Sequence, residues 1–318
     1  NYGGKMIGVL ITTELTKIFR KWRTYIGFMV LAFLVGVVQT AMYFEGPDAV
    51  NMANRSFADS FIMTGNLLNG YFIGNILLNS LIIHIPFLIV LVGGDLLAGE
   101  ATHGTYRMLL TRPISRINVL IAKFLSSFIY TAIFMIFMFA LSVGLSLIIF
   151  GSGELIVFKD KIYIYGTNDI LWRFLMAYGF ATLSMATIIA LSILFSSLVE
   201  NAIGPIITTM AVLIVSLILS NLNIGFFEKL QPYLFTTYTN DWNYFFEDPV
   251  KYDEIVKSAG VLLLYILSIF GITSYIFTKK DILSYVRYEK VNYNNIVCFQ
   301  CYIWAESRSK RNFKKDGR

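Results

Sequence analysis

The sequence carries little charge. Only 14% of its 318 residues are Asp, Glu, Lys or Arg, whereas a soluble domain carries about 25%. Hydrophobic residues make up 56% of the chain, and its mean hydropathy is +0.65. By length alone the chain could form two soluble domains, but this composition excludes them and indicates a membrane protein.

The residues that carry most catalytic and metal chemistry are also scarce. Two histidines, His84 and His103, are too few for a histidine-based metal site. The two cysteines, Cys298 and Cys301, form one isolated C-x-x-C, which we interpret as an incidental pair in a reducing compartment. The sequence contains no H-E-x-x-H, no G-x-S-x-G and no G-x-x-x-x-G-K-[ST] motif. We therefore expect no enzyme, no metal or cofactor site, and no ATP hydrolysis by this chain itself.

In place of these groups the chain has six apolar runs, each long enough to cross a bilayer. About 20 helical residues, at about 1.5 Å each, span a hydrocarbon core of roughly 30 Å. Backbone groups in lipid must bond within their own segment, so each run is predicted to be helical. The runs are Tyr25–Phe44, Tyr71–Val92, Phe124–Phe150, Phe174–Val199, Ala202–Asn223 and Ser258–Thr278. The predicted fold is an all-α polytopic membrane protein with six transmembrane helices.

Basic residues are distributed unevenly between the segments that join these runs. If the N-terminus lies inside, 19 of the 26 Lys and Arg residues fall on the inner side and 12 of the 20 acidic residues on the outer side. This positive-inside asymmetry predicts a multi-pass membrane protein with both termini in the cytoplasm. The membrane that we expect is the plasma membrane of a bacterium or archaeon. It also attributes the basic balance to topology and lipid contact, so no nucleic-acid partner is expected.

The segment before the first run is amphipathic. Apolar side chains recur every three or four residues from Ile7 to Trp22, and Thr, Lys and Arg occupy the other face. This pattern predicts an interfacial helix over residues 1–23. Alternatively, the segment extends the first span and its basic side chains snorkel.

The remaining chain divides into a membrane domain over residues 24–284 and a basic, disordered tail over residues 285–318. Within the domain, aromatic residues crowd the outer loop 224–257, which predicts either short helices in the headgroup region or a packed extracellular cap. Another outer loop alternates weakly over Val157–Tyr165 and is expected to form a short hairpin.

The second run holds three polar residues, Asn75, Asn79 and His84, close to Pro86. Polar residues within membrane helices often mark a transport path, so these three are candidates to line one. The alternative, which we favour from the sequence, is interhelical hydrogen bonding near a proline kink.

A polar segment, GGDLLAGEATHGTYRMLLTRPISR, lies between the second and third runs at Gly93–Arg116. Thr105 can cap a short helix over Tyr106–Leu110, and Pro113 ends it. Arg116 and Lys123 are expected to anchor the next span at the headgroups. The whole loop, 98–118, suits docking into a groove of a partner. The other interpretation is an ordinary basic loop that lies on the cytoplasmic side, as the positive-inside rule predicts.

This loop resembles the first cytoplasmic loop of ABC-2 type transporter permeases. The residues that carry the similarity are Glu100, Gly104, Thr105, Leu109, Leu110, Pro113, Arg116 and Lys123. The amphipathic Lys5–Arg23, the six spans and the long loop before the last span are also similar to that family. The resemblance covers about residues 5–284.

The resemblance implies how such a protein works. Two permease chains pair, and two separate ATP-binding cassette subunits dock beneath them and bind the ATP. The segment Tyr106–Leu110, which includes Arg107, is then the coupling helix, and the turn at Glu200 is a second contact. ATP-driven transport, with export as the expected direction, follows. The alternatives are a membrane anchor or a passive or assembly protein without solute transport, and a membrane-embedded enzyme, against which the scarcity of buried ionisable groups argues.

Overall fold

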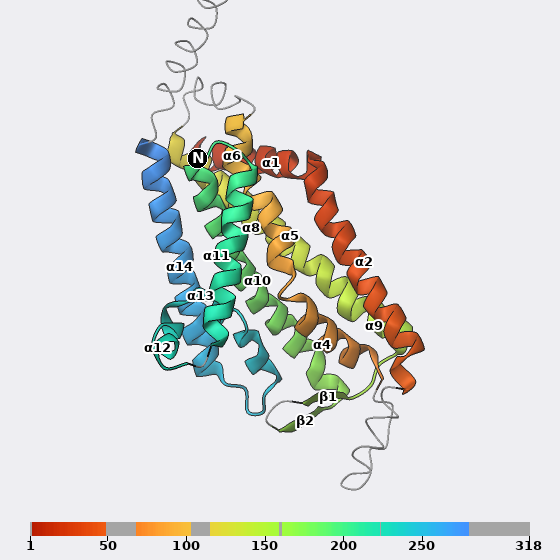
Figure 1. Ribbon diagram of the computed structural model, residues 1–318. Coiled ribbons are helices and arrows are strands. Elements are labelled where there is room, and N and C mark those ends of the chain that lie inside the picture. The colour runs from red at the N-terminus through yellow and green to blue at the C-terminus, as the bar shows by residue number, and fades with distance from the viewer. Residues whose placement is uncertain (1, 49–67, 103–114, 159–160, 223, 280–318) are drawn as a thin grey trace, which may run out of the picture. The chain divides into compact units, whose positions relative to one another are not determined.

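The computed structural model describes residues 2–48, 68–102, 115–158, 161–222 and 224–279 (Figure 1). Within these ranges six helices are long and apolar enough to cross a membrane. They are Trp22–Phe44, Ile85–Thr102, Arg116–Phe150, Thr167–Leu198, Ile203–Asn221 and Tyr252–Lys279. The predicted all-α polytopic fold with six spans is confirmed.

The amphipathic segment forms its own helix. Helix α1 (Tyr2–Arg20) ends before Lys21, whose backbone is extended, and α2 (Trp22–Phe44) begins directly after it. Figure 1 shows α1 running across the same end of the bundle at which α6 (Asp95–Thr102) lies. Because the chain turns between α1 and α2, α1 is not an extension of the first span. We call this end the α1 end.

The second predicted span, Tyr71–Val92, is not one helix, and that prediction is wrong in its boundaries. Helix α4 (Gly70–Leu81) stops at a turn, and α5 (Ile85–Gly93) starts with Pro86 in its first turn. Proline has no N–H for the preceding turn and its ring disfavours a continuous helix. The helical path then continues through α6, so the membrane-length apolar stretch is Ile85–Thr102.

The third span is longer than its apolar run. Helix α8 (Arg116–Phe139) passes through a π-helical segment, Ala140–Leu145, into α9 (Ser146–Phe150). The start of α4 packs closely against α9, because a Cβ on Gly70 would lie 2.6 Å from the backbone of Leu147. Only glycine can fit at that crossing.

Helix α10 (Thr167–Leu198) is, with the Ile85–Thr102 stretch, the most buried of the six and lies at the centre of the bundle. Helix α11 (Ile203–Asn221) packs against it, and α14 (Tyr252–Lys279) is the last span. At the end opposite α1, strands β1 (Leu155–Phe158) and β2 (Ile162–Tyr165) form an antiparallel hairpin, within the loop where a hairpin is expected. We call this end the hairpin end.

The long loop before the last span is built from short helical turns. These are α12 (Gly225–Glu228), a 3-10 turn at Gln231–Tyr233, α13 (Phe235–Tyr238) and a 3-10 turn at Asp241–Phe246. Trp242, Phe245 and Phe246 are buried, and the Phe246 ring lies 5.0 Å from that of Phe174 in α10. These aromatic side chains pack against α10, and the loop that carries them consists of short helical turns, so the structure has features of both interpretations of this loop.

Candidate functional site at the α1 end

Helix α6 is fixed in place at its first turn by a side chain from α10. The Ser196 hydroxyl accepts hydrogen bonds from the Leu97 and Ala98 amides, at 3.1 and 2.9 Å, and donates to the Gly94 carbonyl at 2.6 Å. The first amides of a helix have no hydrogen-bond acceptor within that helix. Here the Ser196 hydroxyl accepts from them, as an N-cap side chain would, although it belongs to another helix. At the other end, the Thr102 hydroxyl donates to the Glu200 carbonyl at 2.7 Å.

A group of four charged side chains joins α6 to α1 and α8. We call Glu14, Lys17, Glu100 and Lys123 the α6 charge cluster. Lys123 is fully buried, and its ammonium lies 2.8 Å from a Glu14 oxygen and 2.9 Å from a Glu100 oxygen. It also donates to the Leu96 carbonyl at 3.2 Å. The buried ammonium thus donates hydrogen bonds to Glu14 and to a backbone carbonyl and forms an ion pair with Glu100, and a buried charge needs such partners.

The fourth member, Lys17, closes the cluster from the surface. Its ammonium lies 2.6 Å from Glu14 and 2.9 Å from Glu100, and the side chain is about half exposed. Burial by itself lowers the pKa of Lys17, but the hydrogen bonds to Glu100 and Glu14 outweigh it and raise that pKa above its usual value of 10.5. Two carboxylates and two ammoniums thus balance each other in charge.

A second set of ion pairs lies at the start of α6. Asp95 accepts from Lys21 at 2.7 Å and from Arg23 at 3.1 Å. Both cations come from the junction of α1 and α2. Asp95 and Glu100 therefore attach α6 at two points to the segment that enters the first span.

The predicted site residues lie in different parts of the structure. Glu100 lies at the centre of the charge cluster, and the exposed Glu200 lies in the turn between α10 and α11. Arg116 is the first residue of α8, and Ser115 takes the N-cap position without a side-chain hydrogen bond. Outside the described residues lie Gly104, Thr105, Tyr106, Arg107, Leu109, Leu110 and Pro113.

Lys123 differs from its predicted role. The sequence suggested a headgroup anchor, but the side chain is completely buried beneath α1 and α6. The sequence interpretation also missed Glu14. Its position offered a signal, because Glu14 follows Leu10 by four residues and precedes Ile18 by four, so it lies on the apolar stripe of an amphipathic helix. An acidic residue there must find a cation when the helix packs.

The candidate path residues lie around the break in the second span. Asn79 and His84 are exposed, and Asn75 is partly so. The Asn79 amide donates to the Asn75 carbonyl at 3.0 Å, and His84 Nδ1 lies 2.9 Å from the Ser80 carbonyl. Among the bonds seen in the described part of the chain, these side chains bond within their own helical stretch and not across to another helix. The interhelical alternative therefore gains no support.

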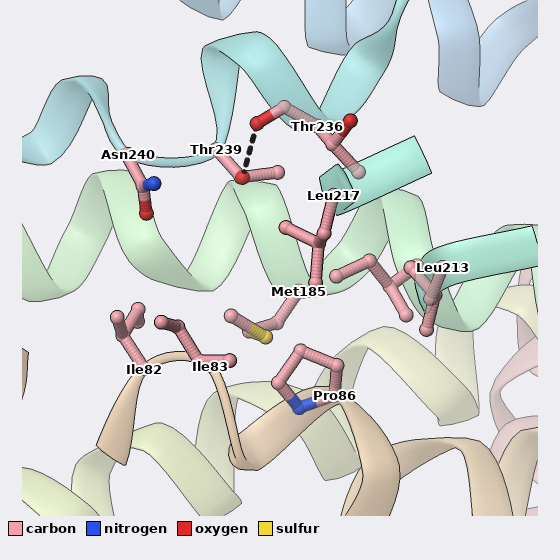
Figure 2. A pocket seen from close by; sticks show the side chains of 10 residues that line it. Ile82, Ile83, Pro86, Met185, Leu213, Leu217, Thr236, Thr239 and Asn240 are labelled. Carbon is pink, nitrogen blue, oxygen red and sulfur yellow. Dashed lines mark hydrogen bonds between the residues drawn. The ribbon is translucent and has the colours of Figure 1, made fainter. Parts of the chain in front are cut away.

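A cavity of about 20 Å³ lies beside the same break. Figure 2 shows Ile82, Ile83 and Pro86 on one side and Leu213, Leu217 and Thr236 on the other. A space of this size holds about one water molecule. It is too small for a transported solute, so this cavity within one chain is no substrate chamber. Over the described residues, no group of three or more His, Cys, Asp or Glu side chains could hold a metal ion.

These features define a class: a multi-pass helical membrane protein with a charged, tightly braced helix at the α1 end. Comparison with known protein families then identifies the family within this class. The family described as ABC-2 family transporter protein matches residues 9–282 of the chain. The chain therefore belongs to this family and is the membrane-spanning, permease component of an ABC transporter. No match to a curated protein was found.

Proposed function

We propose that this chain is the permease subunit of an ATP-driven exporter whose energy comes from separate ATP-binding cassette subunits. ATP is bound and hydrolysed by those subunits, and they dock on the loop 98–118 and on the turn at Glu200. Two permease chains pair in the membrane, with their termini in the cytoplasm of a bacterium or archaeon. Family membership and the structure of the α1 end support the proposal.

The observation that carries this proposal is the position of Glu100. It is the first residue of the loop pattern typical of the family, and it lies one turn before the segment 103–114. Two ammoniums, from Lys17 and Lys123, hold its carboxylate. A force applied by a docked subunit just after Thr102 therefore reaches a helix that is fixed to α1, α8 and α10, and so can move those helices.

The exposed polar residues of α4 and of the turn that follows it support the pairing of two chains. A polar side chain that faces lipid loses its hydrogen bonds to water, which is costly. Asn79, Ser80 and His84 are all exposed in the single chain. We propose that they, with Asn75, face a polar path between two copies and not the lipid.

The proposal is tested by expressing the chain together with a candidate ATP-binding cassette ATPase. The intact chain should retain that protein through purification and change its ATPase rate. Glu100→Ala combined with Leu109→Arg should lose the partner or the change in rate. Asp169→Asn is a matched control, because it removes an ion pair with Arg173 at the hairpin end.

The same experiment separates transport from the alternative. The chain is a membrane anchor or an assembly protein, and not an energised permease, if no ATPase binds. The same conclusion follows if the double substitution changes neither ATPase binding nor the ATPase rate. The orientation is checked separately, by labelling cysteines introduced at Thr13 and Ile164 with a membrane-impermeant reagent in a Cys298→Ser, Cys301→Ser background. Labelling at Ile164 alone in intact cells is the expected result.

A further inference from the structure

A docking loop does not by itself require a buried lysine, yet Lys123 is fully buried near the start of a membrane helix. A lysine at such a position usually extends its ammonium to water at the headgroups, because burying a charge is costly. Here the Lys123 ammonium is shielded from water and contacts oxygen atoms of two other helices, α1 and α6. The arrangement therefore serves a contact between helices and not an anchor at the membrane surface.

The three residues that hold the Lys123 ammonium are distant from it in sequence. Glu14 is 109 residues before it and belongs to α1, whereas Leu96 and Glu100 belong to α6. One ammonium thus joins α1, α6 and α8. Lys17 bridges only α1 and α6, and because it is about half exposed, water weakens its ion pairs. The dry contact, in which charges interact most strongly, is the one made by Lys123.

We propose that Lys123 and Glu14 are positioning residues for coupling: they clamp α1, the end of α6 and the start of α8 into one unit that moves together when an ATPase subunit acts on the chain. This inference rests on the proposed function. It adds that the interfacial helix α1 is part of the moving unit and that its attachment is ionic. Without the clamp, a displacement of α6 would not carry α1 and α8 with it.

The test uses the double variant Glu14→Gln, Lys123→Gln in the full chain, purified with its ATPase. It removes one carboxylate and one ammonium, so the remaining charges stay balanced, and Glu100 keeps Lys17 at 2.9 Å. The docking segment itself is unchanged. We expect the ATPase to co-purify as it does with the intact chain, while the permease-dependent change in ATPase rate falls by roughly tenfold, a usual size for coupling between two sites.

Two further variants set the limits of the test. Lys123→Arg keeps the charge and can reach two carboxylates, so it should restore most of the coupling. Asp169→Asn, at the hairpin end, should leave the ATPase rate of the complex unchanged. The proposal is overturned if the double variant couples like the intact chain. It is also overturned if that variant loses the ATPase together with its monodisperse profile, because the two residues would then only stabilise the fold.

Hydrogen–deuterium exchange tests the clamp without any partner. Amides of α1 from residue 6 to residue 20 should exchange faster in the double variant than in the intact chain, because α1 loses its buried ionic attachment. Unchanged exchange would show that α1 is held in another way and would reject the clamp. If the intact chain binds no ATPase but α1 exchange does rise, the clamp stands and the proposed function fails.

Discussion

Among the residues that the structure describes, each end of the bundle has one buried cation, and the two cations bind different kinds of partner. At the α1 end, Lys123 contacts carboxylates and one carbonyl on two other helices. At the hairpin end, Arg173 of α10 donates to the carbonyls of Phe245 and Glu247, at 2.8 and 3.0 Å. One cation joins regular helices, whereas the other holds an irregular loop.

The chemistry of each side chain explains the difference. A guanidinium has five N–H donors in a planar fork, which suits binding to several carbonyls of a non-helical backbone. Arg173 also lies 4.3 Å from the centre of the Tyr165 ring, so it fixes the end of β2 as well. The ammonium of Lys123 is compact and meets opposite charges. We infer that the hairpin end is built for a fixed shape and the α1 end for the transmission of force.

The largest expected effect comes from breaking the charge balance at the α1 end. Lys123→Met leaves two carboxylates with Lys17 as the cation remaining in the cluster, and loss of one partner of a buried ion pair costs about 3–5 kcal/mol. Thermal unfolding in detergent, followed by tryptophan fluorescence, should show a clear loss of stability. The charge-balanced Glu14→Gln, Lys123→Gln variant should lose much less. Equal losses would mean that packing, and not charge, dominates at this end.

An intermediate effect is expected at the hairpin end. Arg173→Lys keeps the positive charge but cannot reach two carbonyls and Asp169 together, so at least one buried acceptor loses its donor, at a cost of about 1–3 kcal/mol. Exchange of amides in the 241–246 turn should rise, with little change in α1. Lys257→Ala, which removes an exposed lysine beyond this turn, is the matched control. A rise in α1 exchange as well would argue against independent ends.

The smallest effect should come from Lys17→Met, because a half-exposed ion pair contributes about 0–1 kcal/mol. Its pH dependence sharpens the comparison. The pKa of Lys17 is raised in the folded chain, so the stability it adds is fully present below 10.5 and is lost as the pH rises through the folded value. The difference between Lys17→Met and the intact chain should therefore be constant from neutral pH up to about 9 and should shrink only above 10.5. A difference that shrinks below pH 8 would assign the effect to another group.

Much of the fold could be predicted from the sequence, because its signals are local. Hydropathy over about 20 residues marks a span, and three-to-four-residue periodicity marks the amphipathic α1. The spans were misjudged at their ends. Hydropathy placed the second span at Tyr71–Val92, but the helix is interrupted before Pro86, and the less apolar α6 continues the helical path to Thr102. Ser196 and the ion pairs hold the helix beyond the end of its apolar run. A hydropathy window cannot detect such contacts.

The candidate site was predictable only in part. Glu100 followed from a motif, and Glu14 left a trace as an acid on an apolar stripe. No signal in the sequence pointed to Ser196, because nothing in the local pattern distinguishes it from the other serines of its long helix. Its role depends on the position of Gly94 and of the first α6 amides, which approach it from residues about a hundred positions away in the chain.

The sequence by itself determined that this chain is a six-span helical membrane protein with an amphipathic first helix and no ATP-binding loop of its own. These properties depend on the order of residues over short distances. Only the tertiary structure decided that Lys123 is buried and not an anchor, that α6 is held by α1, α8 and α10, and that the second span breaks beside an exposed polar face. The reason is physical: a charge can be buried only where partners from distant parts of the chain converge, and that convergence exists only in the folded bundle.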